Sequence, residues 1–276
     1  MKIHSLIAAL AVTTLVGCSS STSVQSSDTL AGVGVLPVNN LALGGGGQSL
    51  GVQSQISGPI IGSVAKGNRL LVLGDSILAG TASRYGGALC KQIVQMGWRV
   101  AVEAESGQAA DFGREVLRAR LAEGWDAAVV LLGTNPSGSL DAFQRDFTAI
   151  ITSLAPRPVL VLTTSLYKPR QTDINNAIKK IAAANANVTL MDWAAISATP
   201  NILNGDGIHP TDTGRAVLVA AIGQAIGPAP ASPGKCLESK FVDDSLNDSV
   251  MGTTTSSPNA VAAPTSVAPT TSTTTP

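Results

Sequence analysis

The chain has 276 residues, and its 18 Lys and Arg balance 18 Asp and Glu, so the formal net charge is zero. Charged residues make up only 13% and aromatic residues 3%, and no basic stretch stands out. This composition argues against a nucleic-acid-binding surface and leaves few rings on which bases could stack.

The first 18 residues have the pattern of an export signal. A short basic start, Met1-Lys2, precedes a mostly apolar stretch over residues 3–16 that is too short to span a membrane. The following "LVGC", with the Ser-rich stretch after it, is typical of a bacterial lipoprotein signal that is cleaved before Cys18 and carries lipid on its sulfur. An ordinary secretory signal with a chance cysteine is the alternative. A lipid on Cys18 predicts an extracytoplasmic protein of the bacterial cell envelope, anchored to the membrane surface.

Two segments have the composition of linkers. Residues 19–65 are rich in Ser, Gly, Val and Gln and include "LGGGGQ", which predicts a flexible tether. Residues 237–276 are expected to form a low-complexity tail, because from about residue 251 the chain is almost entirely Thr, Ser, Pro and Ala and cannot bury a core. The folded domain is therefore expected over residues 66–236.

Strand and helix patterns alternate through this domain. Short runs rich in Val and Leu, typical of strands buried on both faces of a parallel sheet, occur at Leu70–Gly74, Arg99–Glu103, Ala127–Leu132, Val159–Thr163 and Val188–Asp192. Helical patterns lie at about 84–97, 112–123, 140–154 and 173–185, and a last helix begins at "PTDTG", where Thr211 can cap it. Five strand–helix units in a row predict an α/β domain, a three-layer α/β/α sandwich with a five-stranded parallel sheet. Ligands bind at the carboxyl ends of such strands.

A candidate nucleophile stands at the first of these strand ends. Ser76 follows the strand in "LVLGDSILAG", and a serine hydroxyl needs a base to take its proton. The chain has two histidines, and His4 leaves with the signal, so His209 is the candidate base. Asp206 lies three residues earlier in "GDGIHPTDTG", close enough to orient the imidazole and stabilise its charged form.

Attack on an ester also needs hydrogen-bond donors for the oxyanion. Three are proposed: the Ser76 backbone N–H, the Gly107 N–H in "ESGQ" after the second strand, and the Asn135 amide in "LLGTNPSG" after the third. Asp75 is expected to accept hydrogen bonds from loop N–H groups rather than to act as a catalytic acid.

These motifs, "GDS", the glycine at Gly107, "GTN" and "DGIHP", resemble in order and spacing those of the SGNH (GDSL-type) hydrolase superfamily over roughly residues 68–227. The resemblance implies a flavodoxin-like fold, Ser76 as nucleophile, Gly107 and Asn135 as oxyanion donors, and Asp206 and His209 as acid and base.

One branch of the superfamily is more similar still. The segments "LYKPRQTDINNAI", "VTLMDWAAIS" and "NGDGIHPTDTG" resemble the periplasmic SGNH domains that are fused to membrane acyltransferase domains and O-acetylate envelope glycans. This sequence shows no multi-span membrane domain, which leaves the source of acyl groups for a transferase open.

The remaining cysteines and carboxylates suggest no cofactor. Cys90 and Cys236 are an even pair in an oxidising compartment, so a disulfide and two separate buried thiols are both compatible with the sequence. No cluster with metal-ligand spacing is present, and neither a metal nor another cofactor is expected.

The expected function is that of an envelope-anchored serine esterase. Its substrate would be a small acyl ester, an O-acetyl group on an envelope glycan, cleaved through an acyl-enzyme by the Ser-Asp-His triad. The alternatives are an O-acyltransferase that modifies envelope glycans and a catalytically silent glycan-binding module. The expected partners are the glycan ester and, through the lipid, a membrane, with no nucleic acid.

Overall fold

The structure is a computed structural model that describes residues 51–135 and 138–246. The leader with Cys18, the first part of the expected tether and the chain beyond residue 246 lie outside the described residues.

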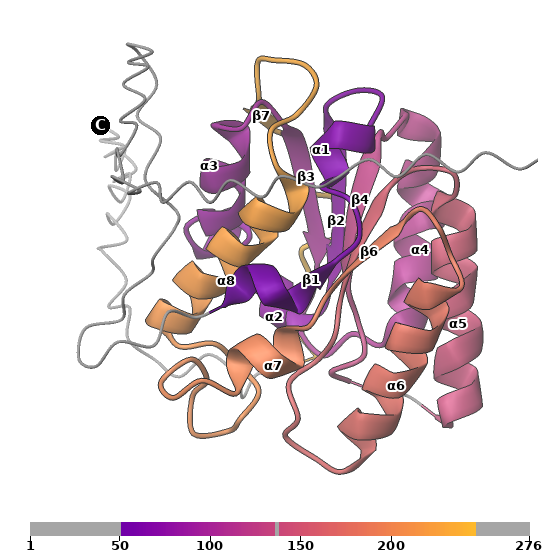
Figure 1. The fold of residues 1–276 in the computed structure, drawn as a ribbon, viewed down its shortest axis with the longest axis vertical. Coiled ribbons are helices and arrows are strands. Elements are labelled where there is room, and N and C mark those ends of the chain that lie inside the picture. The colour runs from indigo at the N-terminus through magenta and orange to yellow at the C-terminus, as the bar shows by residue number, and fades with distance from the viewer. Residues whose placement is uncertain (1–50, 136–137, 247–276) are drawn as a thin grey trace, which may run out of the picture. The chain divides into compact units, whose positions relative to one another are not determined.

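A parallel sheet forms the centre of the domain (Figure 1). Its five main strands are β2 (Arg69–Gly74), β3 (Arg99–Ala104), β4 (Ala127–Leu131), β5 (Val159–Leu162) and β6 (Val188–Met191). Their side chains are almost all buried, as the unbroken apolar runs predicted for strands covered on both faces. The predicted α/β/α class is confirmed, and each predicted strand ends within one residue of its observed bounds.

The number of strands differs from the prediction, because the sheet has seven. Its order is β1-β6-β5-β4-β2-β3-β7. β1 (Ile56–Ser57) pairs antiparallel with β6, and β7 (Lys235–Cys236) pairs parallel with β3. A strand of two residues is too short to show a periodicity in the sequence. β1 and β7 are held at the sheet edges by backbone hydrogen bonds, so no side-chain pattern predicts them.

Helices cover both faces of the sheet (Figure 1). α3 (Ala88–Val94) and α8 (Asp212–Ile226) contact each other on one face, with α1 (Ile61–Val64) against α8. α4 (Ala110–Arg120), α5 (Leu140–Leu154) and α6 (Arg170–Ala183) pack side by side on the other. Two short helices, α2 (Ser76–Ala79) and α7 (Trp193–Ser197), follow the carboxyl ends of β2 and β6. This doubly wound arrangement directs the loops after β2, β3 and β4 to one edge of the sheet.

The helix expected over 84–97 is interrupted. A 3-10 turn, η2 (Ser83–Tyr85), precedes α3, and the two are separated by Gly86 and Gly87 with φ of +94° and +67°. Residues with a side chain rarely adopt this left-handed conformation, and it cannot continue a right-handed helix. The break sets Arg84 and Tyr85 apart from α3.

The described domain extends past both boundaries that composition suggested. At the start, the turn η1 (Val52–Gln55) buries Val52, and Ile61 in α1 has no exposed surface. At the end, Phe241 packs its ring edge-on against Phe112 of α4, with centroids 5.5 Å apart. Residues 51–65 and 237–246 therefore belong to the folded unit, because a few apolar side chains and many backbone hydrogen bonds hold them there.

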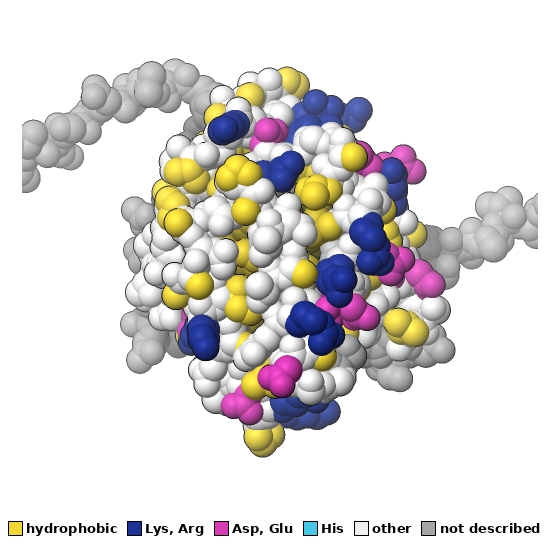
Figure 2. All heavy atoms as spheres, turned by 90° about the vertical axis from the view of Figure 1, so that its right-hand side faces the viewer, with side chains coloured by type: hydrophobic (Ala, Val, Ile, Leu, Met, Phe, Trp, Pro, Cys, Tyr) yellow, Lys and Arg dark blue, Asp and Glu magenta, His cyan; other side chains and the backbone are white. Residues whose placement is uncertain are grey.

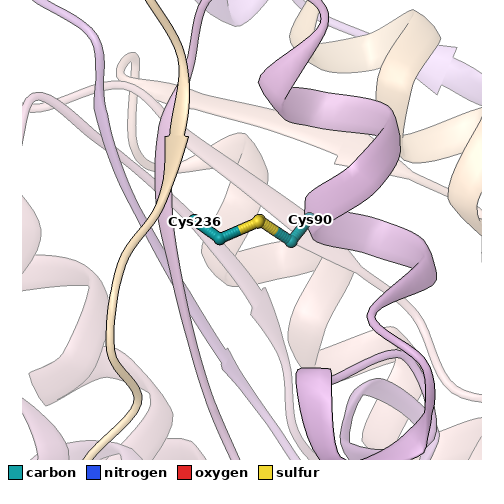
Figure 3. Close-up of a disulfide and its surroundings, with 2 residues drawn as sticks. All are labelled: Cys90 and Cys236. Atoms are coloured by element: carbon teal, nitrogen blue, oxygen red, sulfur yellow. A yellow bond between two sulfur atoms is a disulfide. The ribbon is translucent and has the colours of Figure 1, made fainter.

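A disulfide links the first helix layer to the sheet edge. Cys90 of α3 and Cys236 of β7 are bonded, with Cα atoms 5.8 Å apart (Figure 3). Of the two possibilities that the sequence left open, the structure contains the disulfide.

The surface over α4, α5 and α6 carries charges of both signs. Figure 2 shows its Lys and Arg side chains spread singly across the face, several of them beside acidic groups. Arg114 of α4, for example, pairs with Asp146 of α5 at 2.7 Å. In residues 51–135 and 138–246, no helix combines the length and apolar character needed to cross a membrane.

Candidate active site

The turn after β2 holds Ser76 at the carboxyl end of the sheet. Ser76 is the first residue of α2, and Asp75 caps this helix by accepting a hydrogen bond from the Ile77 N–H at 3.1 Å. A side chain at Gly74 would come within 2.6 Å of Leu78, so the strand can turn this sharply into the helix only because residue 74 is glycine. The result is a serine that is 8% exposed at the point where ligands bind in such sheets.

Ser76, His209 and Asp206 form a hydrogen-bonded chain. The Ser76 Oγ lies 2.9 Å from the His209 Nε2, and the His209 Nδ1 lies 2.8 Å from the Asp206 Oδ2. The structure thus brings together the three residues that the sequence singled out for catalysis. An imidazole that donates from Nδ1 to Asp206 presents the lone pair of Nε2 to the serine hydroxyl.

The loop before α8 is held by its own hydrogen bonds. The Asp206 Oδ1 accepts from the backbone N–H groups of Ile208 at 2.8 Å and His209 at 3.0 Å. The Asn204 N–H donates to the His209 carbonyl at 2.8 Å, and Thr211 caps α8. One carboxylate therefore fixes both the backbone and the ring of the histidine.

Two carboxyl groups of the site have shifted pKa values. Partial burial by itself raises the pKa of Asp206, but hydrogen bonds from the His209 ring and the loop N–H groups outweigh it and hold the pKa below its ordinary value. Asp75 is completely buried, and burial raises its pKa to about 6 in spite of hydrogen bonds from Thr134 and Ile77. Asp206 is thus held as a carboxylate, whereas Asp75 can take up a proton in mildly acidic solution.

The three proposed oxyanion donors lie on adjacent loops. β3 and β4 are the two neighbours of β2 in the sheet, so the loops with Gly107 and Asn135 flank the Ser76 turn. Neither the Ser76 N–H nor the Gly107 N–H donates a hydrogen bond to any residue that the structure describes. Asn135 uses its amide for a 3.3 Å hydrogen bond to the Gln108 carbonyl, which joins the two flanking loops.

Buried polar side chains of α6 support the Asn135 loop, a role that was not expected for them from the sequence. Gln171 donates to the Gly133 carbonyl at 3.0 Å and to Thr164 at 3.2 Å. Asn175 accepts from the Thr164 N–H at 2.8 Å and donates to the Thr164 carbonyl at 2.7 Å. The signal was present in "RQTDINN", where polar residues occupy the inward-facing positions of a helix that is otherwise apolar on that face.

Two more residues from this region contact the same loop. The Tyr167 hydroxyl donates to the Thr134 carbonyl, and the exposed Arg170 donates to the Gly138 carbonyl. Trp193 is buried in the core.

No group of three or more His, Cys, Asp or Glu side chains within the described part of the chain is arranged to hold a metal ion.

Comparison with known proteins gives a family match. The sequence profile described as "GDSL-like Lipase/Acylhydrolase family" matches residues 72–217, just over half of the chain. No curated protein sequence gives a significant match.

Several solved structures are similar at low identity. A two-domain esterase (CEX) active on acetylated mannans is 18% identical, with a TM-score of 0.45 over 58% of this chain and 48% of that one. This chain thus spans about half the length of that esterase. The C-terminal catalytic domain of peptidoglycan O-acetyltransferase A from Streptococcus pneumoniae, with a methylsulfonyl adduct, is 16% identical, with a TM-score of 0.45 over 60% of this chain and 99% of that one. The salicylyl-acyltransferase SsfX3 from a tetracycline biosynthetic pathway is 14% identical, with a TM-score of 0.45 over 57% of this chain and 54% of that one.

Proposed function

Because the chain belongs to the GDSL-like lipase/acylhydrolase family, we propose that it is a serine esterase that cleaves small acyl esters through an acyl-enzyme. One observation carries the proposal: the 2.9 Å contact from the Ser76 Oγ to the His209 Nε2 continues at 2.8 Å from the His209 Nδ1 to Asp206. A module that only binds a glycan has no need of a base held against a serine hydroxyl.

The reaction follows from this geometry. The Ser76 Oγ attacks the acyl carbonyl while its proton passes to the His209 Nε2, and the carbonyl electron pair moves onto oxygen. The N–H groups of Ser76 and Gly107 and the amide of Asn135 donate to this oxyanion. When the tetrahedral intermediate collapses, the alcohol leaves with the proton from His209. Water then loses a proton to His209 as it attacks the acyl-enzyme. The second tetrahedral intermediate collapses as His209 returns this proton to the Ser76 Oγ, which releases the acid and free Ser76.

Asp206 acts on the histidine and not on the substrate. Its carboxylate accepts the Nδ1–H, fixes the tautomer and stabilises the imidazolium that forms during each half of the reaction. The depressed pKa of Asp206 keeps the carboxylate charged in neutral and mildly acidic solution.

The substrate we propose is an O-acetyl ester on an envelope glycan. The side chains of the loops after β3 and β4 are mostly small or polar, including Ser106, Gln108 and Asn135, and the exposed Leu246 lies against Gly107. A long acyl chain needs a continuous apolar surface to bind well, since each buried CH₂ contributes about 0.8 kcal/mol. The sequence resemblance to domains that handle glycan O-acetyl groups supports the same class.

Location is part of this proposal. The signal-like leader and the "LVGC" segment support lipid attachment at Cys18 and an extracytoplasmic, membrane-anchored position in the bacterial envelope. Acetylated glycans are accessible to an enzyme in that position.

Hydrolysis and transfer share the acyl-enzyme and differ in what attacks it. The Asp206 side chain is 42% exposed, so solvent reaches the edge of the site and water can resolve the acyl-enzyme. An O-acyltransferase remains the second candidate, because a sugar hydroxyl can approach by the same route.

The first test is labelling with a fluorophosphonate probe, which reacts with activated serines. The wild type and the control Ser153→Ala, whose serine is exposed on α5, should be labelled, and Ser76→Ala should not. A wild type that takes up no label would instead indicate the silent glycan-binding module.

The second test identifies the acyl group and the acceptor. With p-nitrophenyl esters, acetate should be cleaved faster than octanoate, and a preference for octanoate or longer chains would contradict the glycan proposal. Acetylated envelope glycan should release free acetate. Acetyl transfer to an added glycan acceptor that outruns acetate release would identify a transferase.

A further inference from the structure

The residues after β7 form a strap along the outer edge of β3. This C-terminal strap, residues 237–246, begins beside the Cys236 disulfide and ends at the Gly107 loop. The buried carboxylates of Glu103 and Glu105, at the end of β3, accept hydrogen bonds from the backbone of the strap. The strap's N–H groups donate from Leu237 to the Val100 carbonyl at 2.8 Å, from Lys240 and Phe241 to Glu103 at 2.8 Å each, and from Asp243 to Glu105 at 2.9 Å.

Asp244 is the strap residue whose side chain makes several hydrogen bonds to the rest of the domain. Its carboxylate accepts four hydrogen bonds: from the Arg84 Nε at 2.7 Å and Nη2 at 2.9 Å, the Tyr85 hydroxyl at 2.8 Å and the Ser106 N–H at 2.8 Å. The side chains of Asp244 and Arg84 are only 17% and 22% exposed. Charge-assisted hydrogen bonds in such a partly buried site are stronger than those on an open surface.

These contacts fix the backbone that leads into Gly107. Arg84 also donates to the Ala104 carbonyl at 2.7 Å, so one guanidinium and one carboxylate hold the chain on both sides of residue 105. Gly107 itself has φ of +76°, a region that glycine enters and leaves freely. A Cβ on Gly107 would lie 3.1 Å from the Leu246 Cβ, so the end of the strap also lies directly against this residue.

We propose that Asp244 is a positioning residue for the reaction. By holding the Ser106 N–H, it keeps the following peptide oriented so that the Gly107 N–H can donate to the oxyanion. The inference rests on the proposed function and deepens it, since Asp244 acts through Ser106 and has no contact with the reacting groups. It also lies outside residues 72–217, so part of the machinery would come from beyond the stretch that matches the family.

The charge of Asp244 persists over a wide pH range. Partial burial alone raises its pKa, but hydrogen bonds from Arg84, Ser106 and Tyr85 lower it to about 2. The hydrogen bonds that Asp244 accepts from Arg84, Tyr85 and Ser106 therefore persist at every pH at which an esterase of this kind would be assayed.

The first measurement is hydrogen exchange on the full-length protein. Asp244→Asn keeps the shape of the side chain but cannot accept all four hydrogen bonds, so the amides of residues 104–108 should exchange at least about tenfold faster than in the wild type. Asp243→Asn is the matched control, because among the described residues the Asp243 side chain accepts hydrogen bonds only from Ser245, so the variant should leave this segment unchanged. Equal exchange in Asp244→Asn and the wild type would overturn the inference.

The second measurement separates positioning from a loss of stability. Well below the unfolding midpoint, kcat of Asp244→Asn for an acetyl ester should fall about tenfold, less than the 10²–10³ lost when an oxyanion donor is removed outright, with KM within threefold. The loss should be smaller for the matched thionoester, since sulfur accepts hydrogen bonds more weakly than oxygen does. An unchanged kcat, or an equal loss with both esters, would overturn the positioning role. A wild type inactive on every ester would overturn the proposed function and the catalytic part of this inference, while hydrogen exchange would still show whether Asp244 orders the loop.

Discussion

The Asp75 carboxylate accepts a hydrogen bond from the Thr134 N–H at 3.3 Å and so joins the turn of the nucleophile to the loop of Asn135. A second hydrogen bond, from the Ile77 N–H, caps the short helix that begins at Ser76. The acceptor role expected for Asp75 is the one its contacts show. Asp75, which has no exposed surface, thus fixes the position of the Ser76 turn relative to the Asn135 loop.

This buried carboxyl predicts a measurable pH dependence of stability. Its pKa is about 6 in the folded protein against an ordinary 3.8, so the folded state binds the extra proton between these pH values. The free energy of unfolding should therefore fall as pH rises from about 4 to 6, by up to about 3 kcal/mol relative to Asp75→Asn, which cannot titrate. Urea unfolding of both proteins across this range measures the difference. Parallel curves would mean that folding does not shift the pKa of Asp75.

The catalytic chain predicts non-additive losses. Ser76→Ala and His209→Ala should each lower kcat by about 10⁴-fold or more, since neither the nucleophile nor the base works without the other. The double variant should be little worse than either single one. Circular dichroism should show all three folded, and independent, multiplying losses would contradict a single catalytic unit.

Removal of one oxyanion donor should give a smaller loss. Asn135→Ala should lower kcat about 10²–10³-fold with little change in KM. Asn176→Ala, an exposed asparagine on α6, is the control and should keep full turnover. A loss of less than about threefold at Asn135 would place the oxyanion hole elsewhere.

The disulfide should stabilise the domain without taking part in the chemistry. Cys90 and Cys236 are 146 residues apart, and in the chain-entropy model a loop of this size contributes about 4–5 kcal/mol at most. Replacing both cysteines by serine should lower the urea midpoint to that of the reduced wild type. A midpoint that matches the oxidised wild type would show that the bond adds nothing.

The lipid prediction concerns Cys18, which lies outside the described residues. In the native host, Cys18→Ser should move the protein from the detergent phase to the aqueous phase in Triton X-114 partitioning, with kcat unchanged. Retention of the variant in washed membranes would contradict lipid anchoring at this residue.

Sequence reasoning was most successful where chemistry or burial restricts the residue type. The strand observed at Ala127–Leu131 could be predicted, as Ala127–Leu132, because both of its faces are covered, which requires an unbroken apolar run. His209 could be singled out because the only other histidine of the sequence, His4, lies in the signal-like leader.

The supports of the site could not be predicted in this way. The C-terminal strap, "LESKFVDDSL", is short and carries four charged residues, and its attachment depends on backbone N–H groups that every sequence offers. In the sequence, Glu103 and Glu105 look like ordinary charged residues. Only the structure shows that they accept hydrogen bonds from the N–H groups of the C-terminal strap. Gln171 and Asn175 differ from these glutamates, because polar residues on the inward face of a helix were a signal, and pairing with Thr164 makes them compatible with burial.

The two short edge strands bear on how the protein behaves in concentrated solution. Without β1 and β7, the backbone of β6 and β3 would present open hydrogen-bonding edges, to which a strand of another molecule can add. Both covering segments lie outside residues 72–217. A polypeptide that lacks only these two covering segments would retain Ser76, Asp206 and His209 yet be prone to self-association through the exposed edges of β6 and β3.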